Sequence, residues 1–322
     1  MILLLFFIAF EDKLIMLARA KLMFDLNGYI VIRGLLSSEE VSHALNEIKK
    51  HEDCFVERKD NLRNTNSACD SQLVGDGSTG RYDMGGMLSW KEDSRIFRKL
   101  LAHQGLVPYL KMLLGDGFRL DHSPLIIRQK HESEGFTLHG GPVSKNGMAR
   151  GLHYQCINND IHNSLVAVSF QLTDHNEGDG GFCVVKGSHK LNFPLTDEMM
   201  NGADSDFFEQ CVYQPVTKAG DCVIFSEATI HGCLAWKRKD IERTVALYRF
   251  APATSAYARG YTQWPKEYLD EMTEEQLAVM QSPYHCRFDR PSFNDDGSLG
   301  TAISRSQEKK DFDKKVFGET YF

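Results

Sequence analysis

The sequence predicts a mainly β protein with flanking helices, in which the strands form a sandwich or a barrel. From residue 118 onward, short apolar segments alternate with turns rich in Gly, Asn and Asp, which is typical of packed antiparallel sheets. Residues 165–172 also alternate as a strand does, with one bulky apolar face and one smaller, more polar face that contains Ser169. We therefore expect this strand to lie between a core and a cavity.

Helical patterns precede and follow these strands. Ser37 is suited to cap a helix whose apolar stripe runs from Val41 to Ile48, and an Asn27-Gly28 turn with a short strand comes before it. A second helical region is expected over residues 94–114, with its apolar side chains on the buried face, and another helix over residues 273–280. These segments would cover the sheets.

The chain is expected to form one large domain over residues 21–290. Residues 1–20 are interpreted as an N-terminal extension, and the polar, charged tail 291–322 is expected to be only partly ordered. Residues 57–80 are rich in Asn, Ser, Asp and Gly and have no apolar period, so they predict a long loop that acts as a lid.

Composition excludes several classes of function. The net charge is −7, with 44 acidic and 37 basic residues spread without long runs, so no nucleic-acid surface is predicted. The apolar run at residues 1–10 is too short to span a bilayer. Eight cysteines without a Cys-x-x-Cys pair favour a reducing, cytoplasmic location. An organelle or peripheral membrane location stays open, and oligomeric state is not predicted.

His231 and Arg243 are the most informative pair of residues. They lie twelve positions apart, with His231 after an apolar strand and Arg243 at the start of the next. An imidazole can bind a borderline metal, and a guanidinium can hold a carboxylate in a two-point fork. The pair indicates an oxidative enzyme that uses a metal and a small dicarboxylate.

The chain resembles the phytanoyl-CoA dioxygenase family of non-haem iron enzymes. The resemblance runs from about residue 22 to 252 and rests on the Asn27-Gly28-Tyr29 start, the segment from Gly178 to His189, and the His231 and Arg243 pair. It implies a double-stranded β-helix (jelly roll, cupin-like) core and a need for Fe(II), 2-oxoglutarate and molecular oxygen. His189, within the family's central signature, is interpreted as structural.

The resemblance implies an iron site built from a His-x-Asp pair and a distant second His, but this sequence has no His-x-Asp in the expected window. His139, which is followed by Gly140-Gly141 and lies 92 positions before His231, is the preferred first ligand. His153, 78 positions before His231, is the alternative. Glu227 is a candidate for the missing carboxylate, although a halide or no third ligand would also fit the sequence.

The resemblance assigns Arg243 to the distal carboxylate of 2-oxoglutarate. Arg128, Gln129 and Ser169 are further candidates for cosubstrate binding, because the first two lie on the strand before His139 and Ser169 faces the expected cavity. Which of Arg128 and Gln129 faces inward depends on a strand register that the sequence leaves open.

The predicted function is Fe(II)- and 2-oxoglutarate-dependent hydroxylation of a small organic substrate. One alternative is an iron halogenase, because related halogenases have Gly or Ala where the His-x-Asp carboxylate would lie. Another is a non-catalytic ligand-binding barrel that has lost its metal triad. The sequence does not identify the substrate, since loops of unknown shape select it.

Overall fold

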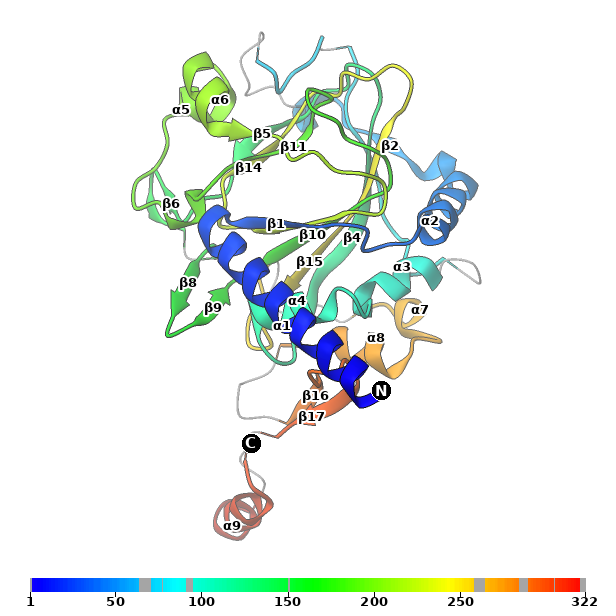
Figure 1. The fold of residues 1–322 in the computed structure, drawn as a ribbon. Coiled ribbons are helices and arrows are strands. Elements are labelled where there is room, and N and C mark those ends of the chain that lie inside the picture. Colours follow the sequence, from blue (N-terminus) through cyan, green and yellow to red (C-terminus); the bar gives the residue numbers. More distant parts are fainter. Residues whose placement is uncertain are drawn as a thin grey trace.

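The computed structural model describes residues 2–63, 71–76, 78–90, 95–149, 151–257, 264–283, 289–303 and 305–318, with side chains described from residue 15 onward. Two antiparallel sheets face each other and form the jelly roll (Figure 1). The larger sheet has the order β1 (Tyr29–Ile32), β13 (Cys222–Ser226), β10 (Val166–Gln171), β15 (Arg243–Ala251), β4 (Arg119–Gln129), β3 (Tyr82–Met84), β2 (Val56–Glu57). The smaller has the order β12 (Val212–Tyr213), β11 (Gly181–Val185), β14 (His231–Leu234), β5 (Phe136–His139). The predicted fold class is confirmed.

Three two-stranded ribbons and a set of helices surround the sheets. The ribbons are β6 (Val143–Ser144) with β7 (Gly147–Met148), β8 (Tyr154–Ile157) with β9 (Asp160–Asn163), and β16 (Arg290–Phe293) with β17 (Leu299–Ala302). The α-helices are α1 (Ile2–Asn27), α2 (Ser38–Lys50), α3 (Arg95–Lys99), α4 (Val107–Leu114), α5 (Asp197–Asn201), α6 (Ser205–Cys211), α7 (Lys266–Leu269), α8 (Glu274–Val279) and α9 (Gln307–Phe317). Short 3-10 turns are η1 (Glu52–Cys54), η2 (Asp60–Leu62), η4 (Leu100–Ala102) and η5 (Ser188–Lys190).

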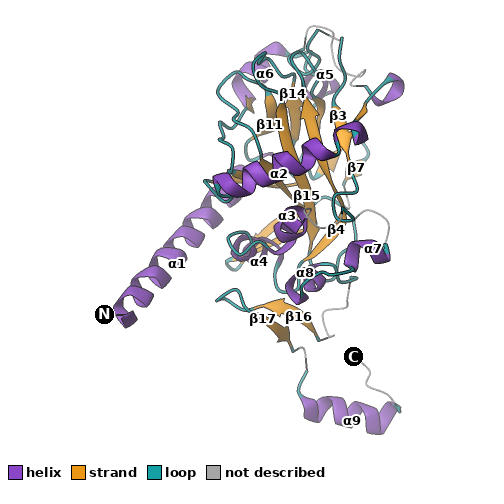
Figure 2. Cartoon of the chain, turned by 90° about the vertical axis from the view of Figure 1, so that its right-hand side faces the viewer, coloured by secondary structure: helices purple, strands orange, loops and turns teal. Residues whose placement is uncertain are grey.

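The alternation of β10 divides the interior as the sequence predicts. Val168 and Phe170 pack in the main core between the larger sheet and helices α3, α4 and α8, which lie on its outer side (Figure 2). Ala167 belongs instead to a separate apolar cluster on the inner face, and Ser169 lines a cavity there. The larger sheet thus has one face for packing and one for ligands.

The helices agree with their sequence signals in most places. Ser37 caps α2 in a capping box with Glu40, and Thr273 caps α8 in the same way with Gln276. The region 94–114 is broken where one helical region is expected: α3 passes into η4, and α4 starts anew at Val107. Pro108 has no amide hydrogen for a helical bond to the preceding turn, so it fits only near the start of a helix.

The two ends of the chain contain more regular structure than expected. α1 runs without a break through residue 20, so the structure shows no boundary there. None of the helices in the described part of the chain combines the length and the apolar character needed to cross a membrane. In the tail, β16 and β17 form a hairpin, and the Phe293 ring stacks on Phe118 at 5.7 Å between centroids. The hairpin therefore belongs to the packed unit.

The contribution of this hairpin can be measured with two phenylalanines of the same tail. We expect Phe293→Ala to lower the free energy of unfolding by about 3 kcal/mol, because it removes a buried ring from the core. Phe312, on α9, is 54% exposed, and Phe312→Ala should change it by less than about 0.5 kcal/mol. Equal effects of the two substitutions in denaturant titrations would contradict this assignment.

Candidate metal centre and cosubstrate cavity

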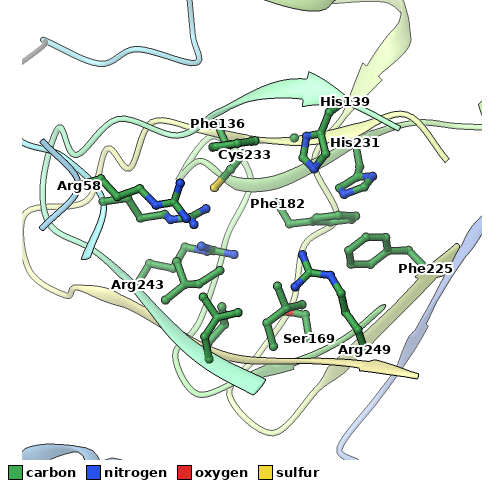
Figure 3. A pocket seen from close by; sticks show the side chains of 16 residues that line it. Arg58, Phe136, His139, Ser169, Phe182, Phe225, His231, Cys233, Arg243 and Arg249 are labelled. Carbon is green, nitrogen blue, oxygen red and sulfur yellow. The ribbon is translucent and has the colours of Figure 1, made fainter. Parts of the chain in front are cut away.

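A cavity of about 320 Å³ lies between the two sheets (Figure 3). Apolar side chains and four arginines share its wall with the two candidate histidine ligands. The lining residues that the following paragraphs use are Arg58, Arg81, Phe136, His139, Ser169, Phe182, Phe225, His231, Arg243 and Arg249. This size falls at the lower end of the range for small-molecule sites.

The strand register brings His139 and His231 directly opposite each other. β5 and β14 pair antiparallel with His139 facing His231, and the two ring centroids lie 4.2 Å apart. Each ring donates its Nδ1–H to the carbonyl two residues earlier, to Thr137 at 2.9 Å and to Thr229 at 2.7 Å. These bonds fix the tautomer and leave each Nε2 lone pair free for a metal.

Glu227 completes a group of three potential ligands. One ligand atom each from His139, Glu227 and His231 lies within 4.8 Å of the others. The Glu227 carboxylate comes from the turn that connects β13 to β14, with Oε2 at 3.6 Å from His231 Nε2. Its Oε1 accepts a hydrogen bond of 2.6 Å from Nε of Arg249. One oxygen is thus held by the protein, and the other faces the histidines.

The protonation states of this group suit metal binding. Burial lowers the pKa of His139 to about 3, and the neighbouring His231 contributes. Burial also lowers the pKa of His231. For Glu227, burial alone would raise the pKa, but the charges of Arg249 and His231 outweigh it and lower the pKa to about 2. Two neutral imidazoles and an ionised carboxylate are the forms that bind metal.

The glycines after His139 fit the chain against the turn that carries Glu227. A Cβ on Gly140 would lie 2.5 Å from the carbonyl oxygen of Thr229 and 2.9 Å from that of Glu227. Gly141 has φ +89°, and a Cβ there would point toward Ile230 at 3.1 Å. A side chain at residue 141 would therefore be strained and crowded. The third candidate ligand, Glu227, lies on a different strand connection, between β13 and β14.

Arg243 is a buried cation that lines the cavity without a carboxylate partner among the described residues. Its Nη1–H donates to Oε1 of Gln129 at 3.0 Å, and its buried Nε has no hydrogen-bond acceptor. Gly181 makes room for it, since a Cβ there would lie 2.7 Å from that Nε. Burial lowers the pKa of Arg243, yet a guanidinium stays charged in proteins. The site therefore suits an anion.

The remaining predicted site residues lie in different places. Gln129 faces inward and orients Arg243. Arg128 is absent from the cavity lining: its guanidinium lies over the Phe55 ring and pairs with Glu52. Ser169 lines the cavity.

The two other histidines lie apart from the ligand group. His153 lines a separate surface pocket near Ser164 and takes no part in the three-ligand cluster. His189, in η5, donates to the Asp25 carbonyl at 3.0 Å and packs edge-on against Tyr154. His189 is thus held by local contacts, as the sequence interpretation expects, and His153 lies outside the candidate ligand cluster.

Three arginines of the cavity were not predicted. Arg249 shares the inner face of β15 with Arg243, six positions earlier, so the alternation of that strand was an available signal. Arg58 and Arg81 lie next to the short strands β2 and β3, inside or beside the segment predicted as a lid. Of that predicted lid, residues 64–70 and 77 lie outside the described part of the chain.

Comparisons with known proteins identify the family and show the same fold. The family model of phytanoyl-CoA dioxygenase (PhyH) matches residues 24–240. HygX from Streptomyces hygroscopicus, solved with nickel, 2-oxoglutarate and hygromycin B, superposes with a TM-score of 0.59 at 21% identity, covering 75% of this chain and 89% of its own. The epimerase SnoN, solved with Fe3+, alpha ketoglutarate and nogalamycin RO, gives a TM-score of 0.52 at 18% identity, covering 84% and 93%. These likenesses show the fold. A search of curated proteins found no match.

The close packing at Gly140 gives a direct test of the site's architecture. Gly140→Ala should destabilise the protein by about 1–3 kcal/mol more than Gly147→Ala, because only the first forces a Cβ against backbone oxygens. Gly147 also has a positive φ, +99°, but nothing within 4 Å of its Cβ position. In both variants an alanine in the left-handed backbone conformation should lower the stability by about 1–2 kcal/mol, so this contribution cancels in the comparison.

Thermal and denaturant unfolding of the two alanine variants measure the difference. The same free-energy loss in both would show that the turn from Glu227 to Thr229 does not press on Gly140.

Proposed function

The chain belongs to the phytanoyl-CoA dioxygenase family, a class of iron(II)- and 2-oxoglutarate-dependent oxygenases, and we propose that it hydroxylates a small organic substrate in the cavity between the sheets. The observation that supports this most directly is that His139, Glu227 and His231 bring ligand atoms within 4.8 Å of one another, next to a cavity that Arg243 also lines without a carboxylate partner among the described residues. The proposal includes oxygen as the second cosubstrate.

The residues present fit an iron(II) ion. His139, His231 and Glu227 would hold it as two imidazoles and one carboxylate, the donor set of the non-haem iron oxygenases. When bound, iron(II) with 2-oxoglutarate and oxygen supplies the oxidation of a substrate C–H bond, coupled to decarboxylation of the cosubstrate.

The cavity also fits 2-oxoglutarate. Arg243 offers a buried guanidinium whose Nε–H is unpaired, and Gln129 holds the group in place through Nη1. A distal carboxylate there would neutralise the positive charge of Arg243 and accept a hydrogen bond from its Nε–H. Ser169 Oγ accepts a hydrogen bond from Gln171 at 2.9 Å, so its own proton can be donated to a ligand in the cavity.

The rest of the wall excludes water and orients the substrate. Phe136, Phe182 and Phe225 line the cavity near the two histidines, so a hydrocarbon portion of a substrate would be desolvated close to His139 and His231. Arg249 keeps Glu227 ionised and in place as the carboxylate ligand. Arg58, at the start of the segment that the sequence predicts as a lid, also contributes to the wall.

Glu227 also separates this proposal from its rivals. A halogenase needs a vacant carboxylate position, and here an ionised carboxylate lies within reach of both histidines. Product formation that depends on chloride would favour the halogenase. A barrel without iron chemistry would show no measurable iron affinity and would release no succinate.

Removal of the Glu227 charge tests the metal centre. Glu227→Gln should weaken Ni(II) or Fe(II) binding by more than about 100-fold, beyond the usual effect of a residue that only supports a ligand. It should also abolish iron-dependent release of succinate from 2-oxoglutarate. Glu242→Gln is the matched control, since Glu242 is half exposed and pairs with Arg128 outside the cavity. If Glu227→Gln bound the metal as tightly as the wild-type protein, Glu227 would not be the third ligand.

The role of Arg243 is tested by a change that keeps its charge. Arg243→Lys should raise the dissociation constant of 2-oxoglutarate on the Ni(II)-loaded protein by about 10- to 100-fold, because a lysine cannot provide the two-point fork. Arg95→Lys, at an exposed position of α3, should leave it unchanged. Isothermal titration measures both. If Arg243→Lys bound 2-oxoglutarate as tightly as the wild-type protein, the distal carboxylate would not be bound by Arg243.

A further inference from the structure

Arg58 and Arg81 line the cavity on the side away from the candidate ligands. Arg58 follows β2 and Arg81 precedes β3, and the amide of Arg58 donates to the carbonyl of Arg81 at 2.8 Å. In Figure 3, Arg58 lies across the cavity from His139 and His231. The two guanidinium groups thus come from neighbouring strand ends and face the same space.

These two cations share a single carboxylate. Asp83 accepts from Nε of Arg58 at 2.6 Å, and from Nε and Nη2 of Arg81 at 2.9 and 3.1 Å. Within the described residues no second carboxylate pairs with either arginine. Asp83 is the side-chain partner of both, and the remaining Nη groups of Arg58 and Nη1 of Arg81 are open to the cavity and its solvent rather than buried without a partner. One positive charge therefore remains unmatched at this end of the cavity.

The surroundings make that charge costly to leave unmatched. Both guanidinium carbons lie over the Phe136 ring, at 5.7 Å for Arg58 and 5.4 Å for Arg81. The Arg81 residue is only 9% exposed, so it has little water to screen it, whereas 29% of the Arg58 side chain is exposed and is screened more. A ring face favours cations but accepts no strong hydrogen bonds. An anion in the cavity would supply the missing acceptors.

The other two arginines of the wall do not need this anion. Glu227 matches the charge of Arg249. Arg243 is reserved, under the proposed function, for the distal carboxylate of 2-oxoglutarate. The net charge at Arg58 and Arg81 thus remains after the metal ligands and the cosubstrate are accounted for.

We infer that Arg58 and Arg81 form a second anion-binding subsite, which holds the acidic group of the primary substrate. This inference rests on the proposed function and deepens it by naming a substrate class. The substrate has an apolar body, which fits against Phe136, Phe182 and Phe225, and one carboxylate or phosphate group at the end far from the iron. Arginine forks bind both of these groups.

The experiment uses the full chain loaded with Ni(II) and saturated with 2-oxoglutarate, so that Arg243 is already engaged. The probes are hexanoate, hexyl phosphate and hexanamide, which share an apolar chain and differ in charge. Isothermal titration should show hexanoate or hexyl phosphate binding at least about tenfold more tightly than hexanamide, as expected for a charge-assisted hydrogen bond. The comparison of the two anions identifies which acidic group is preferred.

Three variants then locate the binding site. Arg58→Gln and Arg81→Gln should each reduce anion affinity at least about tenfold and leave the 2-oxoglutarate dissociation constant within about twofold of wild type. Arg95→Gln, a control on exposed α3, should change neither. Since Arg81 also holds Asp83, unfolding curves check its variant, and Arg58→Gln keeps the bidentate Arg81–Asp83 pair intact.

Two results would overturn the inference. Hexanoate and hexyl phosphate could bind no better than hexanamide, or Arg58→Gln could weaken 2-oxoglutarate as strongly as Arg243→Lys, which would assign the pair to the cosubstrate. Failure of the proposed function looks different, because the wild-type protein would then bind no 2-oxoglutarate at all, whatever the probes do.

Discussion

The turn from Ser226 to Ile230 connects the two sheets, and the geometry of the candidate site depends on how it is held. It leaves β13 of the larger sheet and enters β14 of the smaller one, so Glu227 and His231 approach the cavity from different sheets. Thr229 Oγ1 donates to the Gly28 carbonyl, and the turn packs against Gly140. Local backbone packing, rather than side-chain flexibility, therefore sets the separation of the ligands.

A buried carboxylate at this turn requires a counter-charge. Burial would raise the pKa of Glu227, and Arg249 supplies the charge that reverses this. Because Arg249 binds Oε1, Oε2 remains directed toward the histidines. The ion pair of Glu227 and Arg249 also allows the carboxylate to stay ionised inside an apolar pocket, since a buried charge without a partner would cost about 3–5 kcal/mol. The arginine thus supports the candidate metal site by holding the Glu227 carboxylate.

Features with a local sequence signal could be predicted. The two faces of residues 165–172, the caps at Ser37 and Thr273, and the spacing of His139 and His231 required only periodicity and a family resemblance. Features that depend on tertiary pairing were left open or missed. The sequence left open which of Arg128 and Gln129 faces inward, and the structure shows that Gln129 does, where it holds the cavity-lining Arg243. The Arg58–Arg81 pair was missed, because it depends on short strands without an apolar pattern.

The absence of a His-x-Asp pair from the expected window shows why a search for this motif alone would not find a candidate metal site in this chain. Gly141 occupies the position where the family pattern has its acid, and its positive φ and contact with Ile230 disfavour any side chain there. Glu227, in the connection between β13 and β14, is a candidate that would supply the same donor type and the same charge within reach of both histidines. A metal responds to the position and charge of its ligand atoms, not to their order along the chain. A sequence that lacks the motif can therefore keep the chemistry, provided that the fold brings an alternative carboxylate within reach of both imidazoles.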